Sequence, residues 1–367
     1  MTEQELSAYI QAIRPADEAA MEAARRRQAQ LAKPPGSLGQ LEEISIRLSG
    51  VTGQVCPAMG KCRVAVFAAD NGVVAEGVSC TPPAVTLQQA VNMTFRKTGM
   101  SAMAAAFGDD VSVVDVGIDG DVPPVGILDR KVRRGTGNIA REDAMTRQQV
   151  LDAMAAGMEQ AARARADGVT ALGIGEMGIG NTTTSAAVLA ALTGADIEAV
   201  TGRGGGLTDE GFLRKKEVLR QALALHRPDG SDVIGVLAGV GGLDLAAMTG
   251  AFLGCAHERV PAAVDGFISI AAALCAVRLC PAVRDVLFLS HDSYEVGYRI
   301  AAEALGLQPC LRLGMRLGEG SGCPLLFRVL EGACGVMGGM ATFGEASIED
   351  DYLDEIRAVD AFTVEGA

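Results

Sequence analysis

The sequence predicts an α/β protein with a mostly parallel sheet of about six strands and helices on both faces. Short β-branched apolar runs alternate with longer helical stretches, and runs that are apolar throughout are typical of strands covered on both sides. The chain is rich in Gly (46 residues) and poor in aromatics (4%), which suits tight turns around a small ligand better than a protein-recognition surface. The expected strands are Arg63–Ala69, Val111–Ile118, Val169–Ile174, Val233–Ala238, Val260–Val264 and Val283–Leu289.

Both ends of the chain have helical character. Residues 1–32 are rich in Ala, Glu, Arg and Gln, with a break expected near Pro15, and the Pro-Pro-Gly that follows Lys33 cannot continue a helix. The stretch after Glu331 reads as helical and then acidic. We therefore expect residues 1–35 and 330–367 to form a small helical lobe, and residues 36–329 to form the large α/β domain.

Charge and cysteine usage argue against several classes of protein. With 32 basic and 45 acidic side chains the formal charge is −13, which repels phosphate backbones, so we expect no nucleic-acid partner. The nine Cys form no C-x-x-C pair and the three His are far apart, so we expect no metal site, no disulfide framework and reduced thiols. The first residues lack the apolar core of a signal peptide, and no apolar run is long enough to cross a membrane. These features predict a soluble cytoplasmic protein.

Polar residues and glycines follow five of the expected strands. In open parallel sheets, ligands bind outside the carboxyl ends of the strands, so these segments predict one shared site. The segments are Asp70–Gly72, Gly175–Gly178, Gly239–Gly242, Asp265–Gly266 and Ser290–Asp292.

The segment Gly173–Ser185 carries the strongest local signal. It passes from an expected strand into Gly180, Asn181, Thr182 and Thr183 at an expected helix N-terminus, where backbone N–H groups and hydroxyls can bind a phosphate. A plain capped turn is the alternative. The G-x-G-x-x-G spacing from Gly173 to Gly178 also fits a dinucleotide-cofactor fingerprint, and thus an oxidoreductase.

Two further glycine-rich segments contain charged side chains. Gly202–Gly206 precedes Lys215 and Lys216, which could complete an anion site or belong to a solvated helix. Glu319 lies among glycines in Leu317–Gly322 after an apolar stretch, a setting that suits a general base with a raised proton affinity, although an exposed loop carboxylate is the plainer interpretation.

The segment that follows the first expected strand alternates polar and small apolar residues. Asp70, Ser79 and Gln88 are its polar groups, as a pocket for a flat aromatic ring requires. A connecting loop would explain the same pattern.

Taken in order, these motifs resemble the nicotinate-nucleotide–dimethylbenzimidazole phosphoribosyltransferases, which make the lower-ligand nucleotide of cobamides. The likeness runs from Lys33 to Phe343, about four-fifths of the chain, and the phosphate turn Gly175–Thr183 matches the family string letter for letter. The resemblance implies a Rossmann-like large domain, a small helical lobe from both chain ends and a homodimer.

The resemblance also implies a role for each matching residue. Glu319 takes the place of the family's catalytic base, with Ser321 where the family has Thr, and Glu176 looks like the second active-site carboxylate. The implied donor and phosphate residues are Gly178, Gly180, Asn181, Thr182, Thr183, Lys215 and Gly204, with Lys216 as the alternative to Lys215. The implied acceptor residues are Ser79, Thr81, Gln88, Asp70 and Leu317. Asn71 and Thr81 depart from the His and Tyr of many members, so the acceptor stays open among benzimidazoles, adenine and phenols.

By resemblance, Glu319 deprotonates an aromatic acceptor that attacks the anomeric carbon of nicotinate mononucleotide and releases nicotinate. The pyridinium leaving group is already activated, so we expect no metal or other cofactor. Two alternatives stay open at this point: a nicotinamide-dinucleotide-dependent oxidoreductase, and a non-catalytic paralogue that acts as a subunit.

Overall fold

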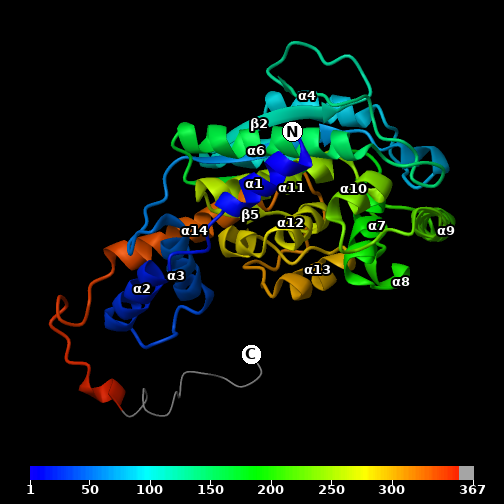
Figure 1. Cartoon of the computed structure of the whole chain (residues 1–367). Coiled ribbons are helices and arrows are strands. Elements are labelled where there is room, and N and C mark those ends of the chain that lie inside the picture. The colour runs from blue at the N-terminus through cyan, green and yellow to red at the C-terminus, as the bar shows by residue number, and fades with distance from the viewer. Residues whose placement is uncertain (355–367) are drawn as a thin grey trace.

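The computed structural model describes residues 1–354 and contains one central sheet covered by helices (Figure 1). Its six strands are all parallel and lie in the order β3-β2-β1-β4-β5-β6, the doubly wound Rossmann order. The strand order reverses between β1 and β4, which opens a crevice at their carboxyl ends. The strands are β1 (Cys62–Ala69), β2 (Asp110–Gly117), β3 (Leu128–Asp129), β4 (Ala171–Met177), β5 (Ala262–Val264) and β6 (Leu287–Leu289).

The predicted fold class is confirmed, with one wrong strand and one missed strand. The strand predicted at Val283–Leu289 is also shorter than expected, because Pro281–Val286 form a 3-10 helix and only Leu287–Leu289 pair in the sheet. Residues Val233–Ala238, predicted as a strand, form helix α10, whose side chains are all buried. A helix buried on every side has no polar face, so its sequence lacks the 3.6-residue periodicity that separates a helix from a buried strand. Strand β3 has two residues, too few to give an apolar run.

Helices cover both faces of the sheet. Helix α11 packs on β1, β2 and β4, while α14 packs on β1, β4 and β5. The helices are α1 (Glu3–Ala12), α2 (Glu18–Gln30), α3 (Gln40–Thr52), α4 (Val85–Thr94), α5 (Gly99–Phe107), α6 (Arg147–Ala166), α7 (Asn181–Thr193), α8 (Ile197–Val200), α9 (Asp209–His226), α10 (Val233–Val240), α11 (Leu243–Glu258), α12 (Phe267–Leu279), α13 (Gly297–Leu305) and α14 (Cys323–Gly339).

The tightest helix contact joins α6 to α11. A Cβ built at Gly157 of α6 would lie 1.8 Å from the Ala247 carbonyl oxygen of α11, and one at Gly250 of α11 would lie 2.0 Å from the Met154 carbonyl oxygen. Glycine at both positions therefore lets the two backbones touch.

The segments at the two chain ends meet beside the sheet (Figure 1). Helix α2 packs on α3, α3 packs on α14, and the Arg27 side chain donates a hydrogen bond to the Met337 carbonyl at 2.7 Å. Helix α1 instead packs on α11, and the terminal ammonium of Met1 lies 3.1 Å from Asp152 of α6. Residues 355–367 of the expected lobe lie outside the described residues, and the division into two domains stays a prediction.

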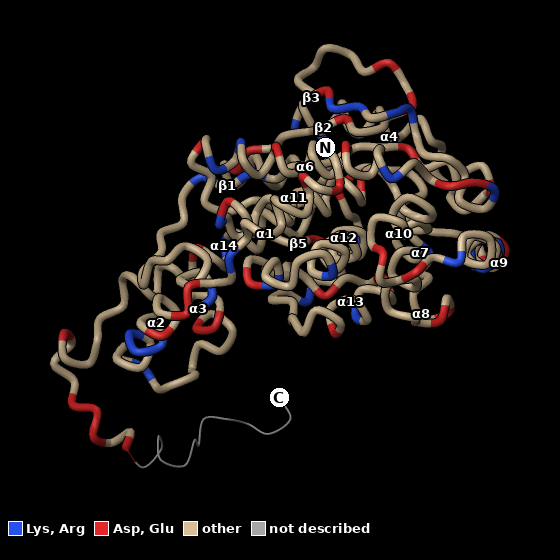
Figure 2. Tube along the Cα trace, in the orientation of Figure 1, with Lys and Arg blue, Asp and Glu red and all other residues tan. Residues whose placement is uncertain are grey.

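Charged residues lie mostly on the outer helices and loops, and the centre of the molecule is largely uncharged (Figure 2). Within β4, β5 and β6, Glu176 is the one charged residue. Among residues 1–354, no helix has the length and apolar character needed to cross a membrane. A carboxylate at the end of a buried strand costs free energy unless it is neutralised or hydrogen-bonded, so Glu176 marks the place to look for a site.

Candidate active site

A cavity of about 280 Å³ lies at the carboxyl edge of the sheet. The ends of β4, β5 and β6 form its floor, and its walls come from residues 78–89, the loop at residues 203–207 and the segment before α14. It brings together ten of the predicted site residues, which are Ser79, Thr81, Glu176, Gly178, Gly180, Asn181, Thr182, Gly204, Leu317 and Glu319.

Glu319 has an unusual backbone. Gly318, Glu319 and Gly320 all have positive φ angles, of 81°, 63° and 83°. A Cβ at Gly318 would lie 2.5 Å from Oε1 of Glu176, and one at Gly320 would lie 2.7 Å from Cγ1 of Val64. The two flanking positions therefore require glycine, and Glu319 adopts a left-handed conformation that a non-glycine residue keeps only where the surroundings hold it.

The Glu319 side chain is buried, with 5% exposed, yet it lines the cavity. Burial raises its pKa, while the Thr98 hydroxyl and the Met100 N–H, 3.5 Å from Oε2, favour the ionised form. The negative charge of Asp265 raises the pKa further. A carboxylate with a raised pKa at a cavity wall has the properties of a general base.

Glu176 and Asp244 form an acidic pair next to the Glu319 loop. The Asn181 amide donates hydrogen bonds to Glu176 and to Oδ2 of Asp244, the latter at 3.0 Å. Burial, and next the charge of Asp244, raise the pKa of Glu176 to about 8, and burial raises that of Asp244 to about 6. Oε1 of Glu176 accepts the Glu319 N–H at 3.1 Å, so the end of β4 is joined directly to the Glu319 loop.

The turn from β4 into α7 forms the other side of the cavity. Gly180, with a φ of 93°, precedes the first residue of α7, so the N-terminus of this helix lies at the cavity, with the Asn181 and Thr183 N–H groups donating to the Gly178 and Gly180 carbonyls. Nζ of Lys215 donates to the Thr182 hydroxyl at 2.9 Å, and a Cβ at Gly204 would lie 2.9 Å from that same hydroxyl oxygen. A helix N-terminus, a hydroxyl and an ammonium thus converge where an anion could bind.

Lys215 and Lys216 differ sharply in their surroundings. Lys215 is fully buried behind the turn, and burial lowers its pKa to about 8 while Glu295 acts in the opposite direction. Lys216 points elsewhere, pairing with Glu198 and lying over the Phe212 ring. Of the two lysines that the sequence left open, Lys215 is the one beside the phosphate turn.

Comparison with known proteins assigns the family. A family model described as phosphoribosyltransferase matches residues 13–348. The chain belongs to this family. A nicotinate-nucleotide–dimethylbenzimidazole phosphoribosyltransferase of Clostridium perfringens is 46% identical over 341 residues, which cover 93% of this chain and 94% of that protein. One from Geobacter metallireducens is 46% identical over 347 residues, 94% of this chain and 98% of that protein. A crystal structure of CobT from Thermus thermophilus superposes with a TM-score of 0.87 at 45% identity, covering 90% of this chain and 99% of the other.

These comparisons give no support to a dinucleotide-dependent oxidoreductase, and the structure supplies a physical reason. Gly173 and Gly175 of the apparent fingerprint lie inside β4 and not in a turn. A Cβ at Gly173 would lie 2.6 Å from the Cys323 Cβ, and one at Gly175 would lie 2.6 Å from the Glu319 carbonyl oxygen. In this phosphoribosyltransferase these glycines make room for α14 and for the Glu319 loop.

Four of the predicted residues do not line the cavity: Asp70, Gln88, Thr183 and Lys215. Gln88 is exposed, while Val85 and Gln89, one helical turn apart on α4, face the cavity. Asp70 is buried at the end of β1, where Oδ2 accepts the Asp119 N–H at 2.8 Å. Thr183 is fully buried in the first turn of α7.

Sequence reasoning left several cavity residues without a role. Asp265 and His291 follow β5 and β6, and their strand-end positions were visible in the sequence. Glu295 and Arg203 also line the cavity, and no motif marks Glu295. Asn71, one of the departures from the family pattern, accepts a hydrogen bond from the Thr184 hydroxyl at 3.3 Å and thereby braces α7.

Proposed function

We propose that this phosphoribosyltransferase moves the 5-phosphoribosyl group of nicotinate mononucleotide to 5,6-dimethylbenzimidazole or a related aromatic base or phenol. The products are nicotinate and an α-ribazole-type 5′-phosphate, used in cobamide nucleotide-loop assembly. Relatives that carry the name of this reaction match more than nine-tenths of the chain. The observation that carries the proposal is the Glu319 carboxylate, buried and with a raised pKa, in the same cavity as the phosphate-type turn.

The donor phosphate binds at the turn between β4 and α7. Its oxygens accept hydrogen bonds from N–H groups of this turn other than those of Ile179 and Asn181, which donate to the Thr86 hydroxyl and the Gly178 carbonyl, and the α7 dipole also favours negative charge there. Lys215 reaches this place through Thr182 and supplies a cation, which a chain of net charge −13 needs in order to bind an anion. Gly204 closes the cradle because a side chain there would meet the Thr182 hydroxyl.

The acceptor occupies the wall formed by residues 78–89 and Leu317. Ser79, Thr81, Val85 and Gln89 offer small and polar groups, and the Leu317 side chain is 58% exposed beside them. A flat ring can lie against Val85 and Leu317 while its polar atoms meet Gln89 and the hydroxyls. The small Thr81 leaves room for a bulky or substituted ring.

The chemical step is a displacement at the anomeric carbon. For a benzimidazole, Glu319 accepts the proton of one ring nitrogen while the lone pair of the other ring nitrogen forms the new bond to that carbon. The bond from that carbon to the pyridinium nitrogen breaks, and its electron pair neutralises the nicotinate ring. Attack from the face opposite nicotinate inverts the anomeric centre and gives the α-nucleotide. Glu176 holds the Glu319 backbone in place through the 3.1 Å hydrogen bond.

The assembly and the domain division are further parts of this proposal. We expect a homodimer in the cytoplasm, with residues 1–35 and 330–367 as a small helical lobe on the large α/β domain of residues 36–329. Light scattering on the purified protein tests the dimer directly, since a monomer has a mass of 37.8 kDa.

One assay tests the function. The purified protein is incubated with nicotinate mononucleotide and, separately, 5,6-dimethylbenzimidazole, benzimidazole, adenine, phenol and p-cresol, and nicotinate release is followed by chromatography. We expect acceptor-dependent nicotinate release together with an equal amount of new nucleotide. Release with none of the acceptors would remove the proposal, and equal release without any acceptor would indicate a hydrolase.

A further inference from the structure

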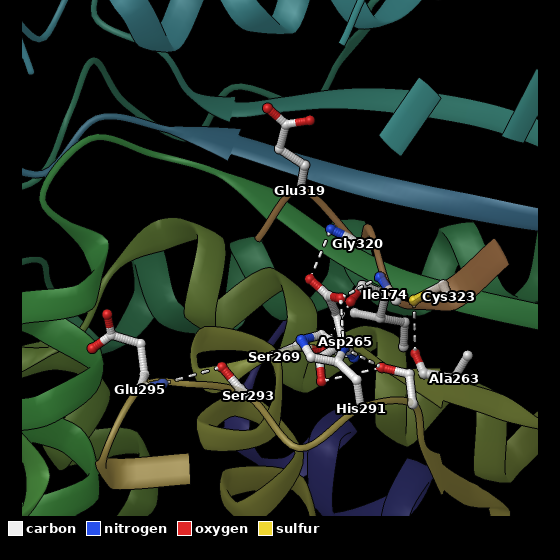
Figure 3. Close-up of polar contacts among 12 residues, drawn as sticks. Ile174, Ala263, Asp265, Ser269, His291, Ser293, Glu295, Glu319, Gly320 and Cys323 are labelled. Atoms are coloured by element: carbon white, nitrogen blue, oxygen red, sulfur yellow. Dashed lines mark hydrogen bonds and ion pairs between the residues drawn. The ribbon is translucent and has the colours of Figure 1, made fainter. Parts of the chain in front are cut away.

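Asp265 lies between the Glu319 loop and the floor of the cavity, directly after β5 (Figure 3). Its side chain is 2% exposed. Oδ2 accepts the Gly320 N–H at 3.0 Å, and Oδ1 accepts the Gly322 N–H at 2.7 Å. Both oxygens of one carboxylate are thus used to hold the backbone immediately after Glu319.

Asp265 is itself fixed from two neighbouring strands. Its N–H donates to the Ser269 hydroxyl at 3.2 Å, and that hydroxyl donates to the Ile174 carbonyl of β4 at 2.9 Å. On the β6 side, Nδ1 of His291 lies 3.8 Å from Oδ1, and the Ser290 hydroxyl lies 3.0 Å from the same nitrogen. The carboxylate therefore belongs to the rigid sheet, and through it the loop takes its position from the sheet.

The Glu319 side chain points away from this cluster (Figure 3). Asp265 consequently does not compete for the position of a substrate next to Glu319, and it acts on Glu319 in two indirect ways. Its hydrogen bonds stabilise the left-handed backbone, which is unfavourable for a residue with a side chain. Burial raises the pKa of Asp265 itself, while His291 and the loop N–H groups favour its ionised form, and in that form its negative charge raises the pKa of Glu319.

We propose that Asp265 is a positioning residue for Glu319, holding the loop at Gly320 and Gly322. The proposal rests on the function proposed above. Other groups also surround Glu319, and none of them holds the backbone after it. Glu176 on β4 accepts the Glu319 N–H, and the Thr98 hydroxyl and the Met100 N–H approach its carboxylate from the start of α5. His291 and Arg316 line the same cavity.

The test compares the wild-type protein with Asp265→Asn. The amide can accept one of the two loop hydrogen bonds and carries no charge. We expect kcat to fall about 10- to 100-fold, less than the roughly 10²- to 10⁴-fold contribution of a general base because Glu319 itself is kept, with the KM for nicotinate mononucleotide changed less than about threefold. The acid limb of the kcat–pH profile should move to lower pH, because Glu319 loses the negative neighbour that raises its pKa. A residue that merely supports the fold would not move this limb.

Asp115 provides a matched control. It is also buried at a strand end, where one of its oxygens accepts two backbone N–H groups, those of Gly117 at 3.1 Å and Ile118 at 2.9 Å, but it does not line the cavity. Asp115→Asn should lower the melting temperature without moving the acid limb. An Asp265→Asn profile that matches wild type in kcat and in its acid limb would overturn the proposal.

Amide hydrogen exchange supplies a readout that does not depend on turnover. In Asp265→Asn the amides of Gly320 and Gly322 should exchange faster, while those of α11 should not. Ser269→Ala is the milder variant if Asp265→Asn fails to fold: it keeps the charge, so kcat should fall about 3- to 10-fold with an unmoved acid limb and faster loop exchange. Unchanged loop exchange in the folded variants would refute the positioning role. Faster loop exchange in a protein that never releases nicotinate would support the positioning role while refuting the proposed function.

Discussion

Replacing Glu319 with Gln separates its chemistry from its structural role. Gln has nearly the same shape and keeps the backbone N–H that donates to Glu176 at 3.1 Å, so the loop should keep its conformation. The variant loses the oxygen that takes the proton, which should lower kcat about 10²- to 10⁴-fold. That range corresponds to roughly 2.7–5.5 kcal/mol of activation free energy. The KM for nicotinate mononucleotide should stay within about threefold, because the phosphate turn is untouched.

The same substitution should lower turnover without lowering the stability of the fold. Burial raises the pKa of Glu319 in the folded protein, so the stability that its carboxyl group contributes is present at low pH and is lost as the pH rises through the folded-state pKa. Gln carries no charge at any pH. The melting temperature of Glu319→Gln near pH 8 should therefore equal or exceed that of wild type, even though the variant is nearly inactive.

Both quantities can be measured on one preparation, by nicotinate release and by a thermal melt. Glu303→Gln serves as the control, since Glu303 is exposed on α13 outside the cavity and should leave kcat and melting temperature unchanged. Wild-type turnover in Glu319→Gln, or a loss of turnover that equals the loss of folded protein, would refute the reasoning.

Three further outcomes follow from the structure. Burial raises the pKa of Glu176 from 4.5 to about 8, so the stability that its carboxyl group contributes at low pH is lost as the pH rises from 4.5 to about 8. Glu176→Gln should therefore show a smaller fall in melting temperature over this pH range than the wild-type protein. A steeper fall would contradict this. Lys215→Gln should raise the KM for nicotinate mononucleotide by roughly 10- to 100-fold, as expected for the loss of a charged hydrogen bond. Lys216→Gln should leave this KM unchanged. Equal effects of the two substitutions would count against Lys215 as the phosphate-binding lysine. Gly157→Ala should cost about 1–3 kcal/mol or more in unfolding free energy, because the α6 and α11 backbones already touch. Gly332→Ala, in open space on α14, should be neutral or slightly stabilising in the same denaturation experiment.

The sheet could be predicted where a strand is buried and its neighbours are helical. β1 and β4 fit their apolar runs to within a few residues, because the length of each run and the residues that follow it agree there with a strand. The strand predicted at Val233–Ala238 was wrong because α10 is buried on all sides, so its apolar residues show no helical period. The usable signal was local: Asp232 accepts the Gly235 N–H at 3.0 Å, as a helix N-cap does.

In the site, glycine patterns were informative and side-chain directions were not. The glycines around Glu319 indicated a special backbone, and the structure shows positive φ angles at all three positions. The choice between Gln88 and Gln89 depends on the rotation of α4, which a sequence fixes poorly at a helix start. Asp265 was visible as a strand end, but its partners lie 55 and 57 residues away, a pairing that depends on the whole topology.

The two halves of the cavity come from different stretches of the chain. The phosphate turn is built from backbone groups between β4 and α7, whereas the opposite wall is built from side chains of residues 78–89, in the loop before α4 and the first half of that helix. A single substitution replaces a side chain, but it leaves the main-chain groups of a turn in place. Such a protein can acquire a new acceptor through a few substitutions in a single short segment while its donor stays the same. Directed libraries confined to positions 79, 81, 85 and 89 should therefore change the acceptor at little cost to donor binding, whereas Thr86 should be kept because its hydroxyl accepts the Ile179 N–H of the phosphate turn at 3.1 Å.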